Sequence, residues 1–274
     1  MKGLKKVVIV SRGISTPKEW DIYQMDTATI EIDDQKFEYT LSRKEEGVTI
    51  ILISGAGIPM SSWEKVFPSL LNLGSVFMYN RLGCGKSTKP NCPQSGFIII
   101  STLKKILEKL GLEPPYLFVG HSLGGLYANL YARLFPNDLL GIVLVDSSHP
   151  EQEKRLKQHT SPLLATFKWL SGKWDKLFCT NKFSELLSLE KTKEEIDKAG
   201  SFPKIPLTVI TGGKAPSKLF VSPSAFNIHL NNQQELTQLS SLGKQVIAKK
   251  SGHFVQLSEP ELIIEEIRKL MAKQ

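Results

Sequence analysis

The sequence predicts an α/β fold built on a mostly parallel β-sheet, and three observations lead to that class. From residue 48 onward, short aliphatic stretches alternate with stretches of helical periodicity, which implies parallel strands joined by right-handed crossovers. The aliphatic stretches contain few polar residues, as is typical of strands covered on both faces. Finally, residues 116–146 combine two such strands with a glycine-flanked serine and a helix.

The composition is that of an ordinary globular protein with a basic surface. The 274 residues are 41% apolar and 23% charged, enough for one substantial core with an inserted subdomain. The net charge is +8, but only six of the 35 positive residues are arginines, and no basic run exceeds two residues. Because nucleic-acid recognition usually relies on arginine forks and clustered basic patches, we expect a lysine-rich solvated surface and no nucleic-acid partner.

The cysteines and the apolar segments indicate the compartment. Three cysteines, Cys84, Cys92 and Cys179, cannot all pair within one chain, and no Cys or His spacing suggests a metal site. We therefore expect reduced thiols and no metal. Residues 7–10 form too short an apolar run for a signal peptide, and no stretch approaches the ~20 apolar residues that span a bilayer. We expect a cytoplasmic protein with no membrane partner, whose oligomeric state is not legible in the sequence.

The N-terminal half contains an edge hairpin followed by core strands. Residues 29–33 and 36–41 alternate polar and apolar side chains, which predicts an antiparallel hairpin at a sheet edge, and residues 7–10 are a further possible strand. Buried strands are expected at residues 48–53 and 75–79. Helical periodicity follows each of them, at residues 59–73 and 97–110, and Gly111 ends the second helix. A glycine-punctuated loop spans residues 80–87.

The most informative stretch is Gly120-His121-Ser122-Leu123-Gly124. It follows an apolar strand at residues 116–119 and opens a helix at residues 123–135, and a second buried strand covers residues 140–146. A serine at such a corner requires a strained backbone, and the flanking glycines keep side chains from colliding across the turn. The corner lifts the Ser122 hydroxyl clear of the sheet and leaves the first helix amides unpaired beside it, which favours nucleophilic chemistry.

The strand–helix rhythm is interrupted between residues 148 and 204. That segment has no strand pattern and contains helical stretches rich in Lys, Glu and Leu, together with several aromatic residues. The rhythm resumes with strands at residues 207–211 and 245–248 and helices at residues 231–242 and 260–273. We therefore divide the chain into a core, residues 1–147 and 205–274, and an inserted helical segment, residues 148–204.

A serine hydroxyl is a weak nucleophile until a base accepts its proton, and His253 is the best candidate for that base. It follows the last strand, so a parallel sheet places it at the same edge as Ser122. His121 is expected to pack or hydrogen-bond beside the turn, and His149 is a candidate substrate contact. The remaining histidines have no strand context and are expected to be exposed to solvent: His159 and His229.

The histidine needs a carboxylate that fixes its tautomer and stabilises its cation. The turn after residue 211 contains no acid, and none follows until Glu235. Asp146, at the end of the preceding core strand, is the stronger candidate, because from there it could reach the imidazole. The alternative for Asp146 is a structural role as the cap of the following turn. Glu235 is a distant third possibility.

A tetrahedral intermediate also needs two hydrogen-bond donors for its oxyanion. One should be the amide of Leu123, directly after the nucleophile. The other should come from the glycine-rich loop at residues 54–57, and the amide of Ala56 is the best candidate. An ordinary glycine turn is the alternative for this loop, although its position after the first core strand argues against that.

Taken together, these motifs resemble those of the α/β-hydrolase family. The resemblance runs from about residue 30 to the C-terminus and includes Ser54-Gly-Ala-Gly57, Tyr79-Asn-Arg-Leu-Gly-Cys-Gly-Lys-Ser87, Gly120-His-Ser-Leu-Gly-Gly125 and Ser251-Gly-His253. It implies an eight-stranded, mostly parallel sheet with helices on both faces, and a cap over the site formed by residues 148–204. The family's order of nucleophile, acid and histidine fits Ser122, Asp146 and His253.

The expected function is that of a serine hydrolase, without metal or cofactor, acting on a carboxylic ester or related acyl bond of a small molecule. The same triad could instead serve carbon–carbon bond hydrolysis, lactone opening or perhydrolysis. Some similar proteins, certain haloalkane dehalogenases, carry the acid at the position of Asp146 but use an aspartate nucleophile, whereas this chain has Ser122. Outside enzymes, the alternative is a ligand-binding homologue that keeps the fold without useful turnover.

Overall fold

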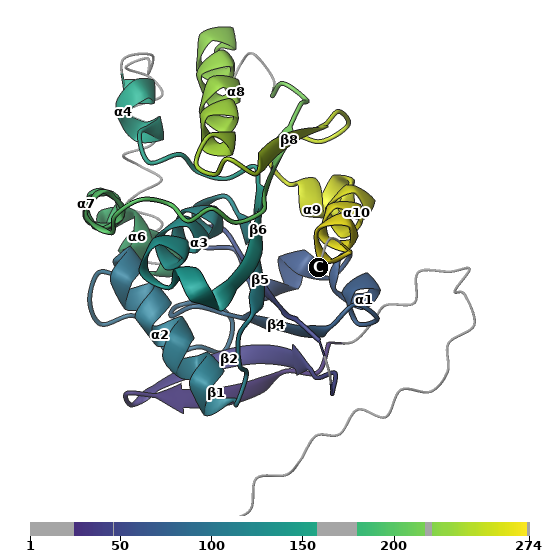
Figure 1. The fold of residues 1–274 in the computed structure, drawn as a ribbon. Helices are drawn as coiled ribbons and strands as arrows, with labels where there is room; N and C mark the ends of the chain where they lie inside the picture. The colour runs from purple at the N-terminus through teal and green to yellow at the C-terminus, as the bar shows by residue number, and fades with distance from the viewer. Residues whose placement is uncertain (1–24, 46, 158–179, 217–220, 273–274) are drawn as a thin grey trace, which may run out of the picture.

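The structure, a computed structural model, describes residues 25–45, 47–157, 180–216 and 221–272. Its centre is one eight-stranded sheet in the order β1-β2-β4-β3-β5-β6-β7-β8 (Figure 1). The strands are β1 Ala28–Ile32, β2 Gln35–Ser42, β3 Thr49–Ile53, β4 Ser75–Tyr79, β5 Tyr116–His121, β6 Leu139–Val145, β7 Leu207–Gly212 and β8 Gly243–Ala248. The expected sheet of eight strands is thus confirmed.

The sheet is parallel except at one edge. The β1–β2 hairpin is antiparallel and β2 pairs antiparallel with β4, whereas every pairing from β4 to β8 is parallel. Parallel strands have their carboxyl ends at a common edge. In register, Ile53 of β3 lies opposite Gly120 of β5, and His121 lies opposite Val145 of β6. The loops that leave these strands therefore meet in one place.

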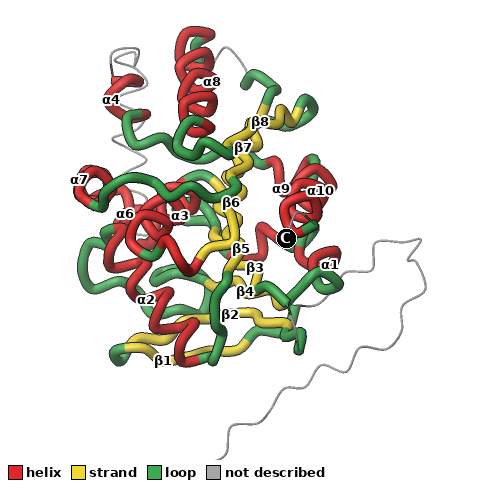
Figure 2. The backbone as a smooth tube through the Cα atoms, viewed as in Figure 1, coloured by secondary structure: helices red, strands yellow, loops and turns green. Residues whose placement is uncertain are grey.

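Helices cover both faces of the sheet (Figure 1). One face carries α2 Gly96–Lys109, α3 Leu123–Leu134 and α8 Pro223–Thr237, and the other carries α1 Phe67–Leu70, α9 Val255–Ser258 and α10 Pro260–Met271. Figure 2 shows the strands as one continuous layer between these two groups of helices. Further described helices are η1 Met60–Trp63, η2 Pro136–Asp138, α4 Gln152–Lys157, α6 Thr180–Leu187 and α7 Leu189–Lys198.

Two apolar cores, one on each face, explain why the central strands β3, β4, β5 and β6 have few polar residues. Successive side chains of β3 alternate between them: Ile51 and Ile53 pack with α2 and α3, while Ile50 and Leu52 pack with Trp63 and the C-terminal helix. All five residues of β3 are buried. Since each fully buried aliphatic side chain contributes about 1.5–3 kcal/mol, a polar substitution on either face of this strand would be costly.

Two expected helices differ from the structure. The stretch at residues 59–73 is split into the 3-10 helix η1 and the short helix α1, because Pro68 lacks an N–H and its ring would clash with the preceding turn of a continuous helix. The helix expected at residues 231–242 instead spans Pro223–Thr237. It starts at an N-cap, Ser222, whose side chain accepts a hydrogen bond from the Ala225 amide at 3.2 Å, with Pro223 as the first helical residue.

The described parts of the inserted segment, residues 148–157 and 180–204, contain helices α4, α6 and α7 and no strand. The four aromatic residues at positions 167, 169, 174 and 178 lie outside the described residues, as do His159, Cys179 and the strand considered at residues 7–10. Among the helices that the structure describes, none is both long enough and apolar enough to cross a bilayer.

Candidate active site

Ser122 lies at the corner between β5 and α3, in a backbone conformation of φ 52° and ψ −122° that side-chain-bearing residues rarely adopt. Glycine is required on both sides of Ser122, because other backbone segments pass too close to leave room for a Cβ atom. A Cβ at Gly120 would lie 2.7 Å from the carbonyl oxygen of Gly124, and a Cβ at Gly124 would lie 2.3 Å from the carbonyl oxygen of Ile53. The glycine spacing therefore determines this turn.

Hydrogen bonds from two neighbouring segments hold the turn. The Ser122 amide donates to the Val145 carbonyl at 3.1 Å, and the Ser122 carbonyl accepts from the amides of Gly125 and Ser148, each at 3.0 Å. Leu123 is the first residue of α3, so its amide has no partner within the helix and lies at the positive end of the helix dipole. A donor is thus available directly after the serine.

Asp146 follows β6 and is 3% exposed. Its carboxylate accepts three hydrogen bonds from three separate segments. Oδ1 accepts from the Gly212 amide at 2.8 Å and from His229 Nε2 at 2.9 Å, and Oδ2 accepts from His253 Nδ1 at 2.7 Å. Burial by itself raises the pKa of Asp146, but the hydrogen bonds and the proximity of the two histidines outweigh it and lower the pKa to about 2.

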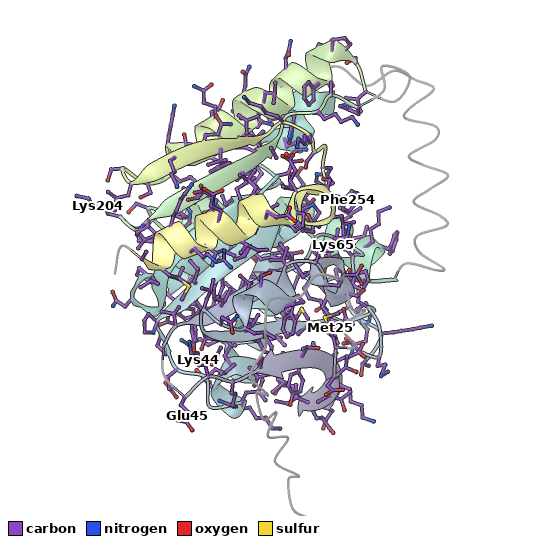
Figure 3. All side chains as sticks on the ribbon, turned by 90° about the vertical axis from the view of Figure 1, so that its right-hand side faces the viewer. Met25, Lys44, Glu45, Lys65, Lys204 and Phe254 are labelled. Carbon is purple, nitrogen blue, oxygen red and sulfur yellow. The ribbon has the colours of Figure 1, made fainter. Side chains whose placement is uncertain are left out.

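His253 belongs to the loop after β8, and its side chain is 46% exposed. Because a carboxylate only accepts hydrogen bonds, Nδ1 carries the proton and Nε2 is left as the basic nitrogen. The next residue, Phe254, is 43% exposed and packs edge-on against the His253 ring, with ring centroids 5.3 Å apart. Figure 3 shows Phe254 near Lys65, whose Nζ donates to the Leu257 carbonyl at 2.8 Å.

His121 links the Ser122 turn to the His253 loop. Its side chain is fully buried, Nε2 donates to the His253 carbonyl at 2.9 Å, and the two imidazole centroids are 4.7 Å apart. Burial, reinforced by the nearby His253, lowers the pKa of His121 to about 4, so the ring is neutral at neutral pH. The expectation that His121 packs and hydrogen-bonds beside the turn is confirmed.

The glycine-rich loop after β3 packs directly against Ser122. A Cβ at Gly55 would lie 3.1 Å from the Ser122 Cβ. Arg81 holds the other side of this loop: Nη1 donates to the Ser54 carbonyl and Nη2 to the Gly55 carbonyl, each at 2.8 Å. In a trans peptide the N–H points opposite to the preceding C=O, so the Ala56 amide points away from Arg81.

Helix α6 of the inserted segment holds both Arg81 and the loop. Glu185 accepts from the Arg81 guanidinium at 2.5 and 3.0 Å, and both side chains are almost fully buried. Burial lowers the pKa of Arg81, but the charge and hydrogen bonds of Glu185 outweigh that effect and raise the pKa, so the guanidinium stays charged. Asn181 accepts from the Gly57 amide at 2.8 Å and donates to the Leu82 carbonyl at 2.8 Å. No sequence pattern indicates these roles, because the partners are about a hundred residues apart in the chain.

The structure gives different positions to two remaining candidates, Glu235 and His229. Glu235 pairs with Arg155 through contacts of 2.8 and 2.9 Å, and its Oε2 lies 3.4 Å from His149 Nε2. Glu235 forms no hydrogen bond or ion pair with Asp146 or His253. The expectation that His229 is exposed is wrong: its side chain is 19% exposed and donates to Asp146. The earlier start of α8 places His229 in the middle of that helix rather than in a loop.

Comparisons with known proteins agree with this fold. A family model described as alpha/beta hydrolase fold matches residues 48–197, more than half of the chain. The chain is similar to the uncharacterized protein YqjL of Bacillus subtilis (strain 168), with 26% identity over 242 residues that cover 86% of this chain and 88% of that protein. It is also similar to an AB hydrolase superfamily protein of Gibberella zeae, with 25% identity over 275 residues that cover 81% and 85% of the two chains.

Among solved structures, the chain resembles that of lip1 from Acinetobacter baumannii AYE. The TM-score is 0.69 at 19% sequence identity, and the match covers 91% of this chain and 93% of the other. At that level of identity, the likeness shows a shared fold.

Proposed function

The chain belongs to the α/β-hydrolase family, and we propose that it is a serine hydrolase that cleaves a carboxylic ester or a related acyl bond of a small molecule. The observation that carries this proposal is the hydrogen bond of 2.7 Å between His253 Nδ1 and Asp146 Oδ2. It makes one imidazole an oriented base, because the nitrogen bound to the carboxylate keeps its proton and the other nitrogen can accept one.

Two further contacts support His253 as the base for Ser122. The carbonyl of His253 is bound by His121, the residue immediately before Ser122. The amide of Ser122 is bound by Val145, the residue immediately before Asp146. The three proposed triad residues thus belong to segments that are hydrogen-bonded to one another in pairs, which limits how far they can move apart.

In the proposed reaction, Ser122 Oγ attacks the substrate carbonyl carbon while His253 Nε2 accepts the hydroxyl proton. Asp146 stabilises the imidazolium that forms. The imidazolium then protonates the leaving alkoxide, and the acyl group remains on Ser122. Water attacks this acyl-enzyme with His253 again as base, which releases the acid and restores the serine. Proton transfer of this kind contributes on the order of 10²–10⁴-fold to the rate.

We assign the oxyanion of the tetrahedral intermediate to the amides of Leu123 and Ala56. Support comes from the helix start at Leu123, from the packing of Gly55 against Ser122, and from the orientation of the Ala56 amide away from Arg81. A single donor of this kind contributes on the order of 10²–10³-fold to kcat. Residues 148–204 would form the cap over this site, with α6 as its contact to the loop that carries Ala56.

The replacement of Ser122 by alanine tests the proposal. The wild-type protein should hydrolyse p-nitrophenyl acetate and react with a fluorophosphonate probe, because both require an activated serine. Ser122→Ala should abolish the labelling and reduce turnover to background. Ser61→Ala, at an exposed serine in η1, is the matched control and should retain both.

Lack of labelling in the wild-type protein, or full activity of Ser122→Ala, would falsify the assignment. An unlabelled protein that still binds small acyl compounds would be a ligand-binding homologue. With an active enzyme, a series of esters of increasing acyl length together with a simple lactone would define the substrate class.

A further inference from the structure

The Asp146 carboxylate makes one contact that a Ser-His-Asp triad does not require. Its Oδ1 is bound by His229 Nε2 at 2.9 Å, while the triad histidine uses Oδ2. The two imidazoles therefore bind opposite oxygens of one buried carboxylate. His229 comes from α8, which is separate in sequence from every segment that carries the proposed triad.

Helix α8 binds the two consecutive residues that follow β6, Asp146 and Ser147. His229 binds the side chain of Asp146, and Gln233 Nε2 donates to the carbonyl of Ser147 at 2.6 Å. Positions 229 and 233 are four residues apart, so both side chains lie on one face of the helix. Gln233 is fully buried and His229 is mostly buried. The two hydrogen bonds therefore attach one face of α8 to the end of the strand that carries the acid.

This contact restricts the rotation of the carboxylate. Oδ1 accepts from both the Gly212 amide and His229, which uses both of its lone-pair directions, whereas Oδ2 is directed at His253. Rotation of the carboxylate about its Cβ–Cγ bond would break all three hydrogen bonds together. Phe226, one turn earlier on α8, stacks on the His229 ring with centroids 6.2 Å apart and so restricts the imidazole as well.

We infer that His229 is a positioning residue for hydrolysis: by donating a hydrogen bond through Nε2, it holds Asp146 so that Oδ2 faces the catalytic histidine. This inference rests on the proposed function. It assigns to α8 a role in catalysis in addition to covering the sheet, and it distinguishes the two histidines that touch Asp146. His253 exchanges protons with Ser122, whereas His229 keeps its proton throughout the reaction.

A pair of amide variants tests this role with little change in polarity. The amide nitrogen of Gln lies about where His Nε2 lies, whereas that of Asn ends one bond shorter. His229→Gln should therefore keep the hydrogen bond and most of the activity, and His229→Asn should lose both. Because a hydrogen bond to a charged group is comparatively strong, we expect its loss in His229→Asn to lower kcat about tenfold to a hundredfold, with KM nearly unchanged. Asn231→Leu, at an exposed position of the same helix, is the control and should behave as wild type.

A spectroscopic measurement makes the test independent of turnover. The proton between His253 Nδ1 and Asp146 should give a low-field ¹H NMR signal in wild type, His229→Gln and Asn231→Leu. In His229→Asn it should shift or broaden, while circular dichroism verifies that the variant is folded. The signal also distinguishes failure of the proposed hydrolase function from failure of the positioning role. If the wild-type protein is inactive and unlabelled but its low-field signal still depends on residue 229, the proposed function is refuted while the contact between His229 and Asp146 still positions the carboxylate.

Four results would overturn the inference. The first is a kcat of His229→Asn within twofold of wild type. The second is a loss confined to KM, which would make His229 a substrate contact. The third is an unchanged low-field signal in His229→Asn. The fourth is a complete loss of activity in His229→Asn together with substantial activity in His253→Ala. This result would show that His229, rather than His253, is the base.

Discussion

Ser122 and Asp146 both have positive φ angles, 52° and 43°. Among the described residues, the only other non-glycine positions with positive φ are Asp33 and Asp34 in the turn between β1 and β2. Such conformations cost on the order of 1–3 kcal/mol each and persist only where the surrounding structure enforces them. Here they occur at the ends of two neighbouring parallel strands, β5 and β6. The strain is thus concentrated where the proposed nucleophile and acid lie.

The role of Asp146 can be separated from that of Glu235 by single substitutions. Asp146→Asn should lower kcat by a factor on the order of 10⁴, because an amide neither selects the Nδ1–H tautomer of His253 nor balances its positive charge. Glu235→Gln should change kcat little, since Glu235 pairs with Arg155. Steady-state kinetics on p-nitrophenyl acetate checks both, and equal losses in the two variants would contradict the assignment of the acid.

The relation between helix α6 and the loop at residues 54–57 is the main feature at the level of elements. Arg81 binds two carbonyls of this loop, and Glu185 and Asn181 of α6 bind Arg81 and the Gly57 amide in turn. A buried ion pair contributes little net stability, but it is strongly oriented when its hydrogen bonds are complete. We therefore interpret the network as a means of orienting loop amides rather than as a source of stability.

Replacement of one member of this network should slow the reaction without abolishing it. Asn181→Ala removes the acceptor of the Gly57 amide, so the loop should lose orientation and kcat should fall about tenfold, less than the loss of an oxyanion donor itself. Ser184→Ala is the matched control: it is buried on the same helix but contacts the loop at residues 92–94. Equal kcat values for the two variants would show that α6 does not act through the loop at residues 54–57.

At the scale of the whole molecule, the two cores enclose a sheet whose carboxyl edge contains several buried ionisable groups. His121 is one of these groups, and its burial lowers its pKa to about 4. In the unfolded chain its pKa returns to about 6.5. Between these two values the unfolded state binds more protons than the folded state. The free energy of unfolding should therefore decrease as the pH falls through this range.

His121→Gln tests this dependence, because the glutamine amide can keep the hydrogen bond to the His253 carbonyl but cannot titrate. Between pH 7 and pH 4 the wild-type protein should lose roughly 3 kcal/mol more of its free energy of unfolding than the variant does. Asp146 does not interfere, since its contribution is lost only as the pH falls from about 3.9 towards 2. Denaturant titrations at several pH values measure the effect, and parallel curves for the two proteins would refute it.

Local patterns in the sequence predicted most of the fold. The strands follow from runs of aliphatic residues, and the Ser122 turn follows from its glycine spacing, because each depends on residues close together in the chain. Errors arose where a local signal was overlooked. Pro68 divides the helix expected at residues 59–73, and Ser222 with Pro223 starts α8 earlier than the periodicity indicates.

The sequence by itself determined the parallel sheet, the strained serine corner and the set of candidate partners, because these depend on periodicity and on steric requirements within a few residues. Only the tertiary structure decided which side chains meet. His253 and His229 lie 107 and 83 residues from Asp146, and Arg81 lies 104 residues from Glu185. Such contacts depend on the order of strands in the sheet and on the position of each helix over it, and no short stretch of the chain encodes either.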